Sequence, residues 1–556
     1  MTPEISGIHH VTAICRDPER NVRFYTNVLG LRMVKLTVNH DAPTVYHLYY
    51  ADDVGTPGAT LTFFPWPRAP RGHQGVGQAT VVSLAIRPTS LGYWAERLIH
   101  QGVDFEGPRR ALDETRIAFR DPDGLMLELV AHPDAERRPY WGDGPVPADH
   151  AIRGIHGVTL WEDAIGATDE LLTETLGFWP VTQRQSIRRY ALGEGRSGQL
   201  LDVREAPDFW EGRVAPGAVH HVAWRTPDER EHQAWQETIA ELGYHVTPVI
   251  DRHYFRSIYF REPGGVLFEI ATDPPGFTID EPARSLGSSL VLPPWLREDR
   301  ERIERLLPTP PSRLVQLASH ATDAVAATDP QAHMNASLGF IHRYVPPSKG
   351  QRTTLLLLHG TGGSEDDLLP LGEQLMSGAA LLSPRGQVDE DGMARFLSRR
   401  EPGVVDRADL RRRTDALADF VASASAEYGF DAGRVVAVGY SNGANMVSSL
   451  LLRHPRTLTG AALIHPVVPV EPETLPDLRA TSVLVVVGAN DESVPEGEPE
   501  RLARMLRDAG ADVELSRHPG AMRSIKRRLS GHGPGYSDTG LSPAESIPLV
   551  RRFRAP

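Results

Sequence analysis

Cysteine is nearly absent from this chain of 556 residues: Cys15 is the only one, so no disulfide can form within it. No apolar run approaches the roughly 20 residues that a membrane-spanning helix requires. The first residues, MTPEISGIHHVT, lack the basic and then apolar segments of a secretory signal. These absences favour a soluble protein of the reducing cytoplasm that has no membrane partner.

Positive charge is also scarce. The chain has 59 Lys and Arg against 72 Asp and Glu, a formal net charge of -13. Binding to nucleic acid depends on clustered basic residues that neutralise phosphates, so nucleic acid is not an expected partner. The hydrophobic fraction of 40% and the charged fraction of 24% are ordinary for a globular protein. The length predicts three or four structural units.

Four similar segments fill the first half of the chain. GIHHVT at 7–12 returns as GIHGVT at 154–159, and RDPDGLMLEL at 120–129 returns as REPGGVLFEI at 261–270. Each segment has the pattern of a strand, a helix and about three further strands. We therefore predict an α+β half with segments one and two in residues 1–150, and segments three and four in residues 151–275.

The rest of the chain has a different pattern. Residues 276–333 are rich in proline around one short charged helix, and we interpret them as a tail and linker. From 334 to 556, buried apolar runs such as VVAVGY alternate with helical stretches. That alternation is typical of a parallel sheet covered by helices, so we predict a separate α/β domain there.

Histidines and glutamates at matching strand positions indicate a metal site in the first half. Inward-facing residues of three strands, His10, His221 and Glu269, would form a two-histidine, one-carboxylate face, which suits non-haem Fe(II). Segments two and three offer Glu128 and His156 but no histidine in the strand VVSLAI. Spacing alone also allows the set His156, His221 and Glu269; we favour the set with His10.

A second catalytic pattern lies in the α/β domain. Ser441 is the central residue of Gly439–Gly443, GYSNG, between an apolar strand and a helix, as expected of a hydrolase nucleophile. Asp491 follows a later apolar strand and would be the acid of the triad. His532 would be the base, with His518 as the alternative. The backbone N–H groups of Thr361 and Asn442 would form the oxyanion hole.

The first half resembles the vicinal-oxygen-chelate superfamily, and within it the ring-cleaving dioxygenases that act on hydroquinones. The resemblance rests on GIHHVTAI, NVLGLR, HHVAW, DRHYFRSIYFREPGG and LFEIATDPPGF, and on the tail LPPWLREDRERIERLLP. It implies paired βαβββ modules, the first with the fourth, and iron bound by His10, His221 and Glu269. Further residues match positions that support the ligands or contact the substrate: His9, Thr12, His220, Arg252 and Tyr259.

The second half resembles the carboxylesterase and lysophospholipase family of α/β-hydrolases, especially in LSPRG and DRADLRRRTDALADF. One departure concerns the base. The family runs a HPGGH-like segment directly into LTPEE-like residues, but an insertion here separates His518 from LSPAE, which displaces His532.

These observations together predict a bifunctional enzyme. An Fe(II)-dependent dioxygenase, with Mn(II) as the other metal considered, would open a hydroquinone or catechol-like ring with O₂. A fused serine hydrolase would act on an ester, a thioester or the cleavage product. The alternatives are a quinone- or electrophile-binding module, or a non-oxidative metalloenzyme, fused to the esterase. The pattern leaves the oligomeric state open, a homo-oligomer included.

Overall fold

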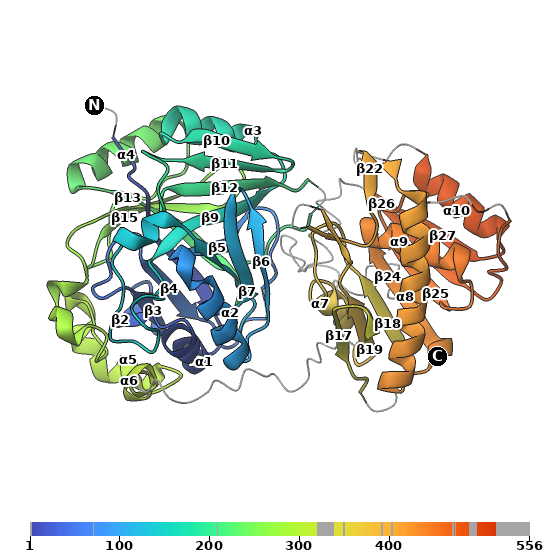
Figure 1. Cartoon of the computed structure of the whole chain (residues 1–556), viewed down its shortest axis with the longest axis horizontal. Coiled ribbons are helices and arrows are strands. Elements are labelled where there is room, and N and C mark those ends of the chain that lie inside the picture. The colour runs from blue at the N-terminus through green and yellow to red at the C-terminus, as the bar shows by residue number, and fades with distance from the viewer. Residues whose placement is uncertain are drawn as a thin grey trace, which may run out of the picture. The chain divides into compact units, whose positions relative to one another are not determined.

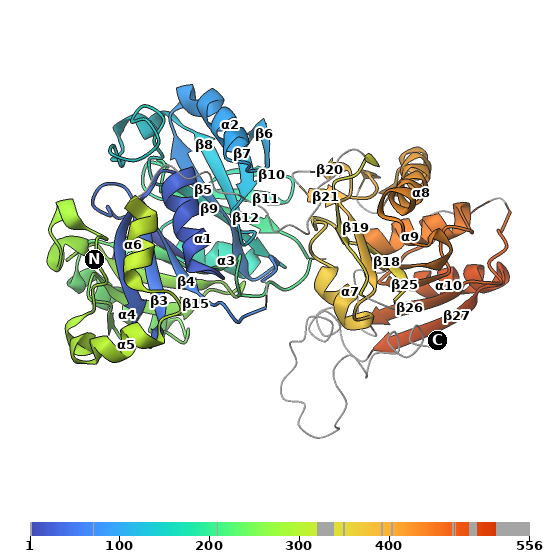
Figure 2. The same ribbon diagram turned by 90° about the horizontal axis from the view of Figure 1, so that it is seen from below.

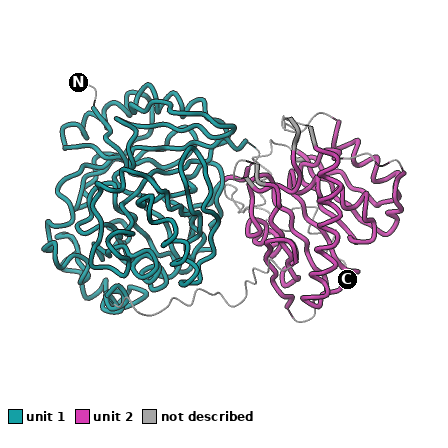
Figure 3. The backbone as a smooth tube through the Cα atoms, in the orientation of Figure 1, with its two compact units in different colours: residues 1–207, 212–327 teal, residues 208–211, 328–556 magenta. Residues whose placement is uncertain are grey.

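The computed structural model describes residues 3–70, 72–207, 209–319, 338–348, 351–390, 393–401, 404–469, 472, 474–488 and 497–518. The chain divides into two compact units, one of residues 1–207 and 212–327 and one of residues 208–211 and 328–556 (Figure 3). Each unit has a hydrophobic core of its own.

The first unit repeats one module four times, a strand, a helix and three strands (Figure 1). The strands of modules one and two are β1 Ile8–Cys15, β2 Arg32–Asn39, β3 Ala42–Ala51, β4 Thr60–Pro65, β5 Gln78–Ile86, β6 Phe105–Ala111, β7 Glu114–Arg120 and β8 Met126–Ala131. Those of modules three and four are β9 Ile155–Glu162, β10 Trp179–Arg184, β11 Ile187–Ala191, β12 Leu200–Glu205, β13 Val219–Thr226, β14 Ile250–Asp251, β15 Arg256–Arg261 and β16 Leu267–Thr272. The module helices are α1 Pro18–Arg23, α2 Leu91–His100, α3 Gly166–Glu170 and α4 Glu229–Glu241. The βαβββ organisation predicted from the repeats is confirmed.

The modules pair in a way that crosses the sequence order. One eight-stranded sheet has the order β14-β15-β16-β13-β1-β4-β3-β2 and joins module one to module four. The other has the order β10-β11-β12-β9-β5-β8-β7-β6 and joins module two to module three. At the centre of each sheet the first strands of two modules run antiparallel, β1 beside β13 and β5 beside β9. The favoured pairing of the first and fourth segments is therefore confirmed.

Large apolar side chains on the module helices attach them to the sheets. Trp94 of α2 and Trp235 of α4 are completely buried, at equivalent places in modules two and four. The indole nitrogen of Trp94 donates to the carbonyl of His150 at 2.9 Å. Burying two such rings removes a large apolar area from water, which fixes the helices against the strands that carry the site.

The tail contains more helix than the sequence pattern predicted. The charged helix is α5 Arg300–Leu306, and a second helix, α6 Pro311–Ser319, follows it. Leu314 and Leu317 of α6 are buried, and α6 packs on α1 in the same unit (Figure 2). The sequence analysis interpreted this segment as linker because prolines surround it, but proline is well tolerated in the first turn of a helix.

The second unit is built on a seven-stranded sheet with the order β17-β19-β18-β24-β25-β26-β27. Its strands are β17 His342–Val345, β18 Thr354–Leu358, β19 Ala380–Pro384, β24 Val435–Tyr440, β25 Gly460–Ile464, β26 Ser482–Gly488 and β27 Asp512–His518. Its helices are α7 Leu369–Leu375, α8 Arg407–Tyr428, α9 Asn442–Arg453 and α10 Glu498–Asp508. Two small hairpins pair β20 Val388–Glu390 with β21 Met393–Arg395, and β22 Arg399–Glu401 with β23 Val404–Val405.

All neighbours in this sheet run parallel except β17, which is antiparallel to β19. The helix α9 follows β24 and packs beside α8 (Figure 2). The predicted α/β fold is confirmed. Among the described residues, no helix combines the length and apolar character needed to cross a membrane.

Candidate functional site

Three strands of the first sheet bring His10, His221 and Glu269 together. All three side chains are buried, and their ligand atoms lie within 4.8 Å of one another. The Glu269 Oε2 atom lies 2.9 Å from His221 Nε2 and 3.4 Å from His10 Nε2, and the two Nε2 atoms are 3.3 Å apart. Ligands about 2.1 Å from one metal ion, at angles between octahedral and tetrahedral, are separated by about 3.0–3.4 Å. The three side chains have the spacing of a metal site.

The two oxygens of the Glu269 carboxylate have different surroundings. Its Oε1 atom accepts a 2.5 Å hydrogen bond from the Ser257 hydroxyl on β15. Its Oε2 atom is buried and faces the Nε2 atoms of His10 and His221, and no other group among the described residues donates to it. A buried carboxylate oxygen is costly unless it is paired, and a bound cation would satisfy it. The sequence analysis missed Ser257, which only the pairing of β15 with β16 brings beside the glutamate.

The flanking histidines lie directly against the presumed ligands. His9 Nδ1 is 2.8 Å from His10 Nδ1, and His220 Nδ1 is 2.8 Å from His221 Nδ1. Burial, followed by the charge of the neighbouring histidine, lowers the pKa of His9 to about 3, and the same two causes lower the pKa of His220 to about 3. Both side chains are therefore neutral at physiological pH and able to orient the adjacent ring through one ring nitrogen.

Thr12 belongs to a chain of hydrogen bonds that the sequence analysis did not find. Its hydroxyl lies 2.8 Å from that of Thr62, which is 2.9 Å from His47 Nε2. The other ring nitrogen of His47 lies 2.8 Å from the hydroxyl of Tyr49. Alternation along TVYHLYY puts His47 and Tyr49 on one face of β3, which is the signal that could have identified them.

Arg252 and Tyr259 lie together beside the metal cluster. Arg252 Nε donates to the Tyr259 hydroxyl at 3.2 Å, and its Nη1 pairs with Asp41 at 2.8 Å. The Tyr259 ring centre is 5.7 Å from that of His221. Burial raises the pKa of Tyr259, so the phenol keeps its proton. Its oxygen accepts from Arg252, which leaves the phenol hydrogen available to another acceptor.

In the second unit, Ser441 has the backbone of a nucleophile elbow. It stands between β24 and α9 with φ 48° and ψ -112°, a conformation that is strained for any residue with a side chain. Strain of this kind recurs at catalytic positions, and it projects the serine from the carboxyl end of the strand. Asn442 is the first residue of α9, so its N–H has no acceptor within the helix.

Both glycines of GYSNG, Gly439 and Gly443, allow neighbouring backbone segments to approach the elbow closely. A Cβ on Gly443 would lie 2.2 Å from the Leu358 carbonyl oxygen, and one on Gly439 would lie 2.7 Å from Ala444 Cα. The loop with Thr361 leaves the end of β18, and Leu358 is paired with Gly439. Thr361 and Asn442 thus follow adjacent ends of neighbouring parallel strands, where an oxyanion hole requires them, and their role stays a prediction.

The acid and base of the triad are less completely described. Asp491 and His532 both lie outside the described residues. His518 ends β27 and is paired with Gly488, the last residue of β26. The base stays a prediction, with His532 and His518 as the two candidates.

Comparison with known proteins separates the two halves. Residues 7–129 and 154–270 match the profile of the Glyoxalase/Bleomycin resistance protein/Dioxygenase superfamily. "Putative ring-cleaving dioxygenase MhqO" of Bacillus subtilis is 42% identical over 309 residues, which are 98% of that protein and 55% of this chain. The chain belongs to this superfamily. "Chlorohydroquinone/hydroquinone 1,2-dioxygenase" of Sphingobium indicum is 33% identical over 320 residues, which are 98% of that protein and 56% of this chain.

The second half of this superfamily member has relatives of its own. Residues 397–537 match the profile of the Dienelactone hydrolase family. "Putative hydrolase MhqD" of Bacillus subtilis is 48% identical over 161 residues, which are 80% of that protein and 29% of this chain. The chain thus fuses a module like the ring-cleaving dioxygenases of the superfamily to a hydrolase domain.

Among the described residues, the second sheet of the dioxygenase-like half has no equivalent metal cluster. His10 is paired with Ala223 and that residue with Glu269, whereas in the other sheet Gly157 is paired with Ser83 and that residue with Glu128. Gly157 is therefore the counterpart of His10, and Val81 that of His221. His156 corresponds to His9 and lies in the other sheet, so the structure does not bring it together with His221 and Glu269.

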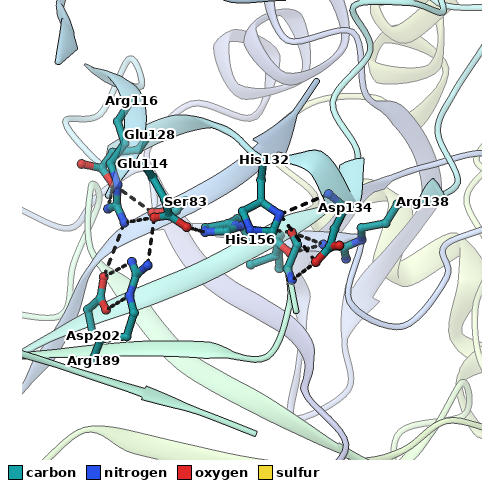
Figure 4. A network of polar contacts seen from close by, with 12 residues as sticks. Ser83, Glu114, Arg116, Glu128, His132, Asp134, Arg138, His156, Arg189 and Asp202 are labelled. Carbon is teal, nitrogen blue, oxygen red and sulfur yellow. Dashed lines mark hydrogen bonds and ion pairs between the residues drawn. The ribbon is translucent and has the colours of Figure 1, made fainter. Parts of the chain in front are cut away.

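Guanidinium groups surround the carboxylates of the second sheet (Figure 4). Arg116 donates to Glu128 at 2.7 Å, in the place that Ser257 has beside Glu269, and to Glu114 at 2.6 Å. Arg189 holds both oxygens of Asp202 at 2.7 and 2.8 Å. The positive charge that a metal would supply comes here from arginines, so the retained Glu128 is neutralised within the protein.

We expect Arg116→Met to destabilise the first unit by about 3–5 kcal/mol at neutral pH, because it removes the guanidinium that pairs with the buried carboxylates of Glu114 and Glu128. Burial raises the pKa of Glu114, but the hydrogen bond with His156 and the charges of His156, Arg189 and Arg116 lower it well below its usual range. This stabilising contribution is present above the unfolded pKa near 4.3 and is lost as the pH falls further. The deficit of the variant should therefore shrink in acid.

Denaturant unfolding at pH 7 and at pH 3, which is more than one unit below the unfolded pKa of Glu114, measures both effects. Arg184→Met is the matched control, because Arg184 pairs with Asp113 on the surface, where both side chains are exposed. It should cost less than about 1 kcal/mol. Equal destabilisation by the two substitutions would contradict the role of the buried cluster.

Proposed function

We propose that the chain is a bifunctional enzyme that opens a hydroquinone or catechol-like ring in an Fe(II)-dependent reaction and hydrolyses an ester, a thioester or the cleavage product. The observation that carries the first activity is the buried cluster of His10, His221 and Glu269, in which one carboxylate oxygen and two imidazole nitrogens face one another. A two-histidine, one-carboxylate face is the ligand set of Fe(II) oxygenases. The hydroquinone activity in the name of the Sphingobium relative supports the substrate class.

Iron bound by these three residues would offer open positions for a ring oxygen and for O₂, and would supply the chemistry that breaks the ring. Ser257 fixes the carboxylate of Glu269, and His9 and His220 fix the two imidazoles. Tyr259, kept protonated by burial and oriented by Arg252, donates a proton to an oxygen of the substrate. Burial lowers the pKa of His47 and so keeps its ring neutral. His47 is therefore the candidate base in the chain of hydrogen bonds that links Thr12, Thr62 and His47.

In the hydrolase domain, Ser441 acts as the nucleophile and Asp491 orients the base. The base is His532 or His518. The N–H groups of Thr361 and Asn442 stabilise the oxyanion, where each donor contributes about 10²–10³ in rate. Esterase assays of His518→Ala and His532→Ala identify the base, because only replacement of the catalytic histidine should lower kcat by several orders of magnitude.

Oxygen uptake tests the ring-opening activity. The full chain is loaded anaerobically with Fe(II), freed of excess metal, and mixed with substituted hydroquinones and catechols in an oxygen electrode. We expect uptake of one O₂ per ring opened, together with loss of the aromatic absorbance. Bound iron without uptake for any of these compounds would refute ring cleavage. Turnover independent of O₂ would favour the non-oxidative metalloenzyme, and stoichiometric binding without turnover would favour a binding module.

A further inference from the structure

A cavity of about 340 Å³ lies between modules one and three, away from the metal cluster. Its wall includes the residues at the start of β1, the residue Arg153 shortly before β9, and the loops that lead into β4 and β12. Two matching hydrogen bonds cross here: Ile8 N to Gly198 O, and Ile155 N to Gly58 O, both 2.9 Å. These two hydrogen bonds occupy equivalent positions in modules one and three, so the cavity lies near the approximate twofold symmetry of the duplicated modules. The backbone groups of both bonds are already hydrogen-bonded to each other.

Five arginines line this cavity, and Asp134 is the one carboxylate in its lining: Arg137, Arg138, Arg153, Arg196 and Arg225. Two of the arginines are neutralised locally. Arg225 holds both oxygens of Asp273, and Arg196 pairs with Glu194. Asp134 itself accepts the Ser197 N–H at 3.1 Å and lies 3.5 Å from the ring of His132 (Figure 4). The lining thus has an excess of positive charge.

Arg138 and Arg153 have only neutral hydrogen-bond partners. Arg138 donates to the carbonyls of Ile155 and Gly58 at 2.6 and 3.0 Å and to the Ser197 hydroxyl at 2.9 Å. Arg153, only 2% exposed, donates to the carbonyls of Arg138 and Ala148. Within the described part of the chain, no carboxylate forms an ion pair with either one. Arg153 also stacks on the ring of Tyr140, with its guanidinium carbon 3.7 Å from the ring centre. Buried charges in proteins are ordinarily paired, so these two guanidinium groups favour an anionic ligand.

Burial disfavours the charged form of Arg138. It lowers the pKa of the guanidinium to about 10, although Asp52 and Asp134 act in the opposite direction. Burial also lowers the pKa of Arg153. The two nearby carboxylates therefore do not offset the loss of solvation.

Three glycines keep space open around the Arg138 guanidinium. Gly58, Gly154 and Gly198 have φ values of 90°, 83° and 91°, which residues with side chains rarely adopt. A Cβ at these positions would lie 3.3, 2.9 and 3.3 Å from a terminal nitrogen of Arg138. The backbone of three separate loops is shaped to admit a guanidinium at the wall of the cavity. The Arg138 guanidinium is therefore held in a fixed position by the backbone around it.

We propose that this cavity binds a small dianionic oxyacid, recognised by Arg137, Arg138 and Arg153 from the segment that joins modules two and three. Planar guanidinium groups bind carboxylates and phosphates through paired hydrogen bonds, which suits either source of the anion. The volume is in the range of sites for small molecules and exceeds what a single water requires. This site is separate from both proposed catalytic centres and does not depend on the proposed function.

Calorimetric titration of the full chain with inorganic phosphate and with succinate, at constant ionic strength, tests the site. We expect saturable binding of at least one probe and a matching rise in Tm that saturates with its concentration. Binding of phosphate alone supports a phosphate ligand, of succinate alone a dicarboxylate, and of both a general oxyanion site. Absence of saturable binding with both probes overturns the proposal.

Variants distinguish the cavity from other positive surfaces and from a bound metal. Arg137→Ala should weaken binding at least about tenfold, the effect of one hydrogen bond to a charged group. Arg137 is exposed at the rim and has no ion pair in the described residues, so this variant should fold. Arg138→Met should abolish binding if it folds.

Arg302→Ala, which removes an exposed arginine of α5, is the matched control and should bind as wild type. Equal affinities of Arg137→Ala and wild type would overturn the proposal, because binding at the metal centre or to nonspecific charge would persist in that variant.

Discussion

We expect His10→Ala to lose bound iron and oxygen-dependent ring cleavage, whereas His156→Ala should keep both. His10 supplies one of three buried ligand atoms, and no described side chain is positioned to replace it. Mutation of residues that only support a ligand typically costs 10–100-fold in metal affinity or activity, so loss of a ligand should exceed about 100-fold. Metal analysis after gel filtration, together with oxygen uptake, measures the effect.

The two variants form a matched pair, since both replace a buried histidine near the start of a central strand. His156 is hydrogen-bonded to Glu114 at 2.8 Å and to Ser197 at 3.1 Å, in a cluster that already contains two arginines. His156→Ala should lower stability by about 1.5–3 kcal/mol, the cost of a hydrogen bond to a charged group, without loss of iron. Iron lost from His156→Ala and retained by His10→Ala would contradict the assignment of the metal site.

Ser441→Ala abolishes ester hydrolysis by the second unit. Removal of a triad serine costs about 10⁴–10⁶-fold in kcat, because the remaining triad members act only through it. A chromogenic short-chain ester reports the loss directly. The substitution removes one oxygen atom from a half-buried elbow residue, so the fold should be retained.

The same variant tests whether the two activities are separate. Oxygen uptake by iron-loaded Ser441→Ala should equal that of wild type, and ester hydrolysis by Glu269→Gln should be unchanged. Ester turnover at the wild-type rate in Ser441→Ala would eliminate this residue as the nucleophile. Residual turnover that is lost in Asp491→Asn would indicate a different nucleophile served by the same acid.

Much of the architecture could be predicted from local patterns. The repeats GIHHVT and GIHGVT and the paired turns before β8 and β16 specify four βαβββ modules, because each pattern sets strand alternation and a turn within a few residues. GYSNG between an apolar strand and a helix predicts the elbow for the same reason. The helix α6 was not predicted, because its stability comes from burial of Leu314 and Leu317 against the unit and not from its proline-flanked sequence.

The alternation of side chains along single strands could not decide between the ligand set with His10 and the set with His156. Comparison of GIHHVT with GIHGVT already aligns His156 with His9, a signal that the spacing argument did not use. The register then makes Gly157 the counterpart of His10 and puts His156 in the other sheet. Ser257 and His47 could not be assigned from single strands, since their partners Glu269 and Thr62 reach them only across a sheet.

By itself, the sequence determined which modules form, where the strands place histidines and glutamates, and where a serine is exposed at an elbow. Tertiary structure alone decided that arginines neutralise the retained Glu128 and that five arginines meet around a cavity, and it confirmed that module one joins module four. The physical reason is that strand and turn preferences act over a few neighbouring residues. Ligand spacing, charge neutralisation and cavity lining depend on side chains that approach within a few ångströms from distant parts of the chain.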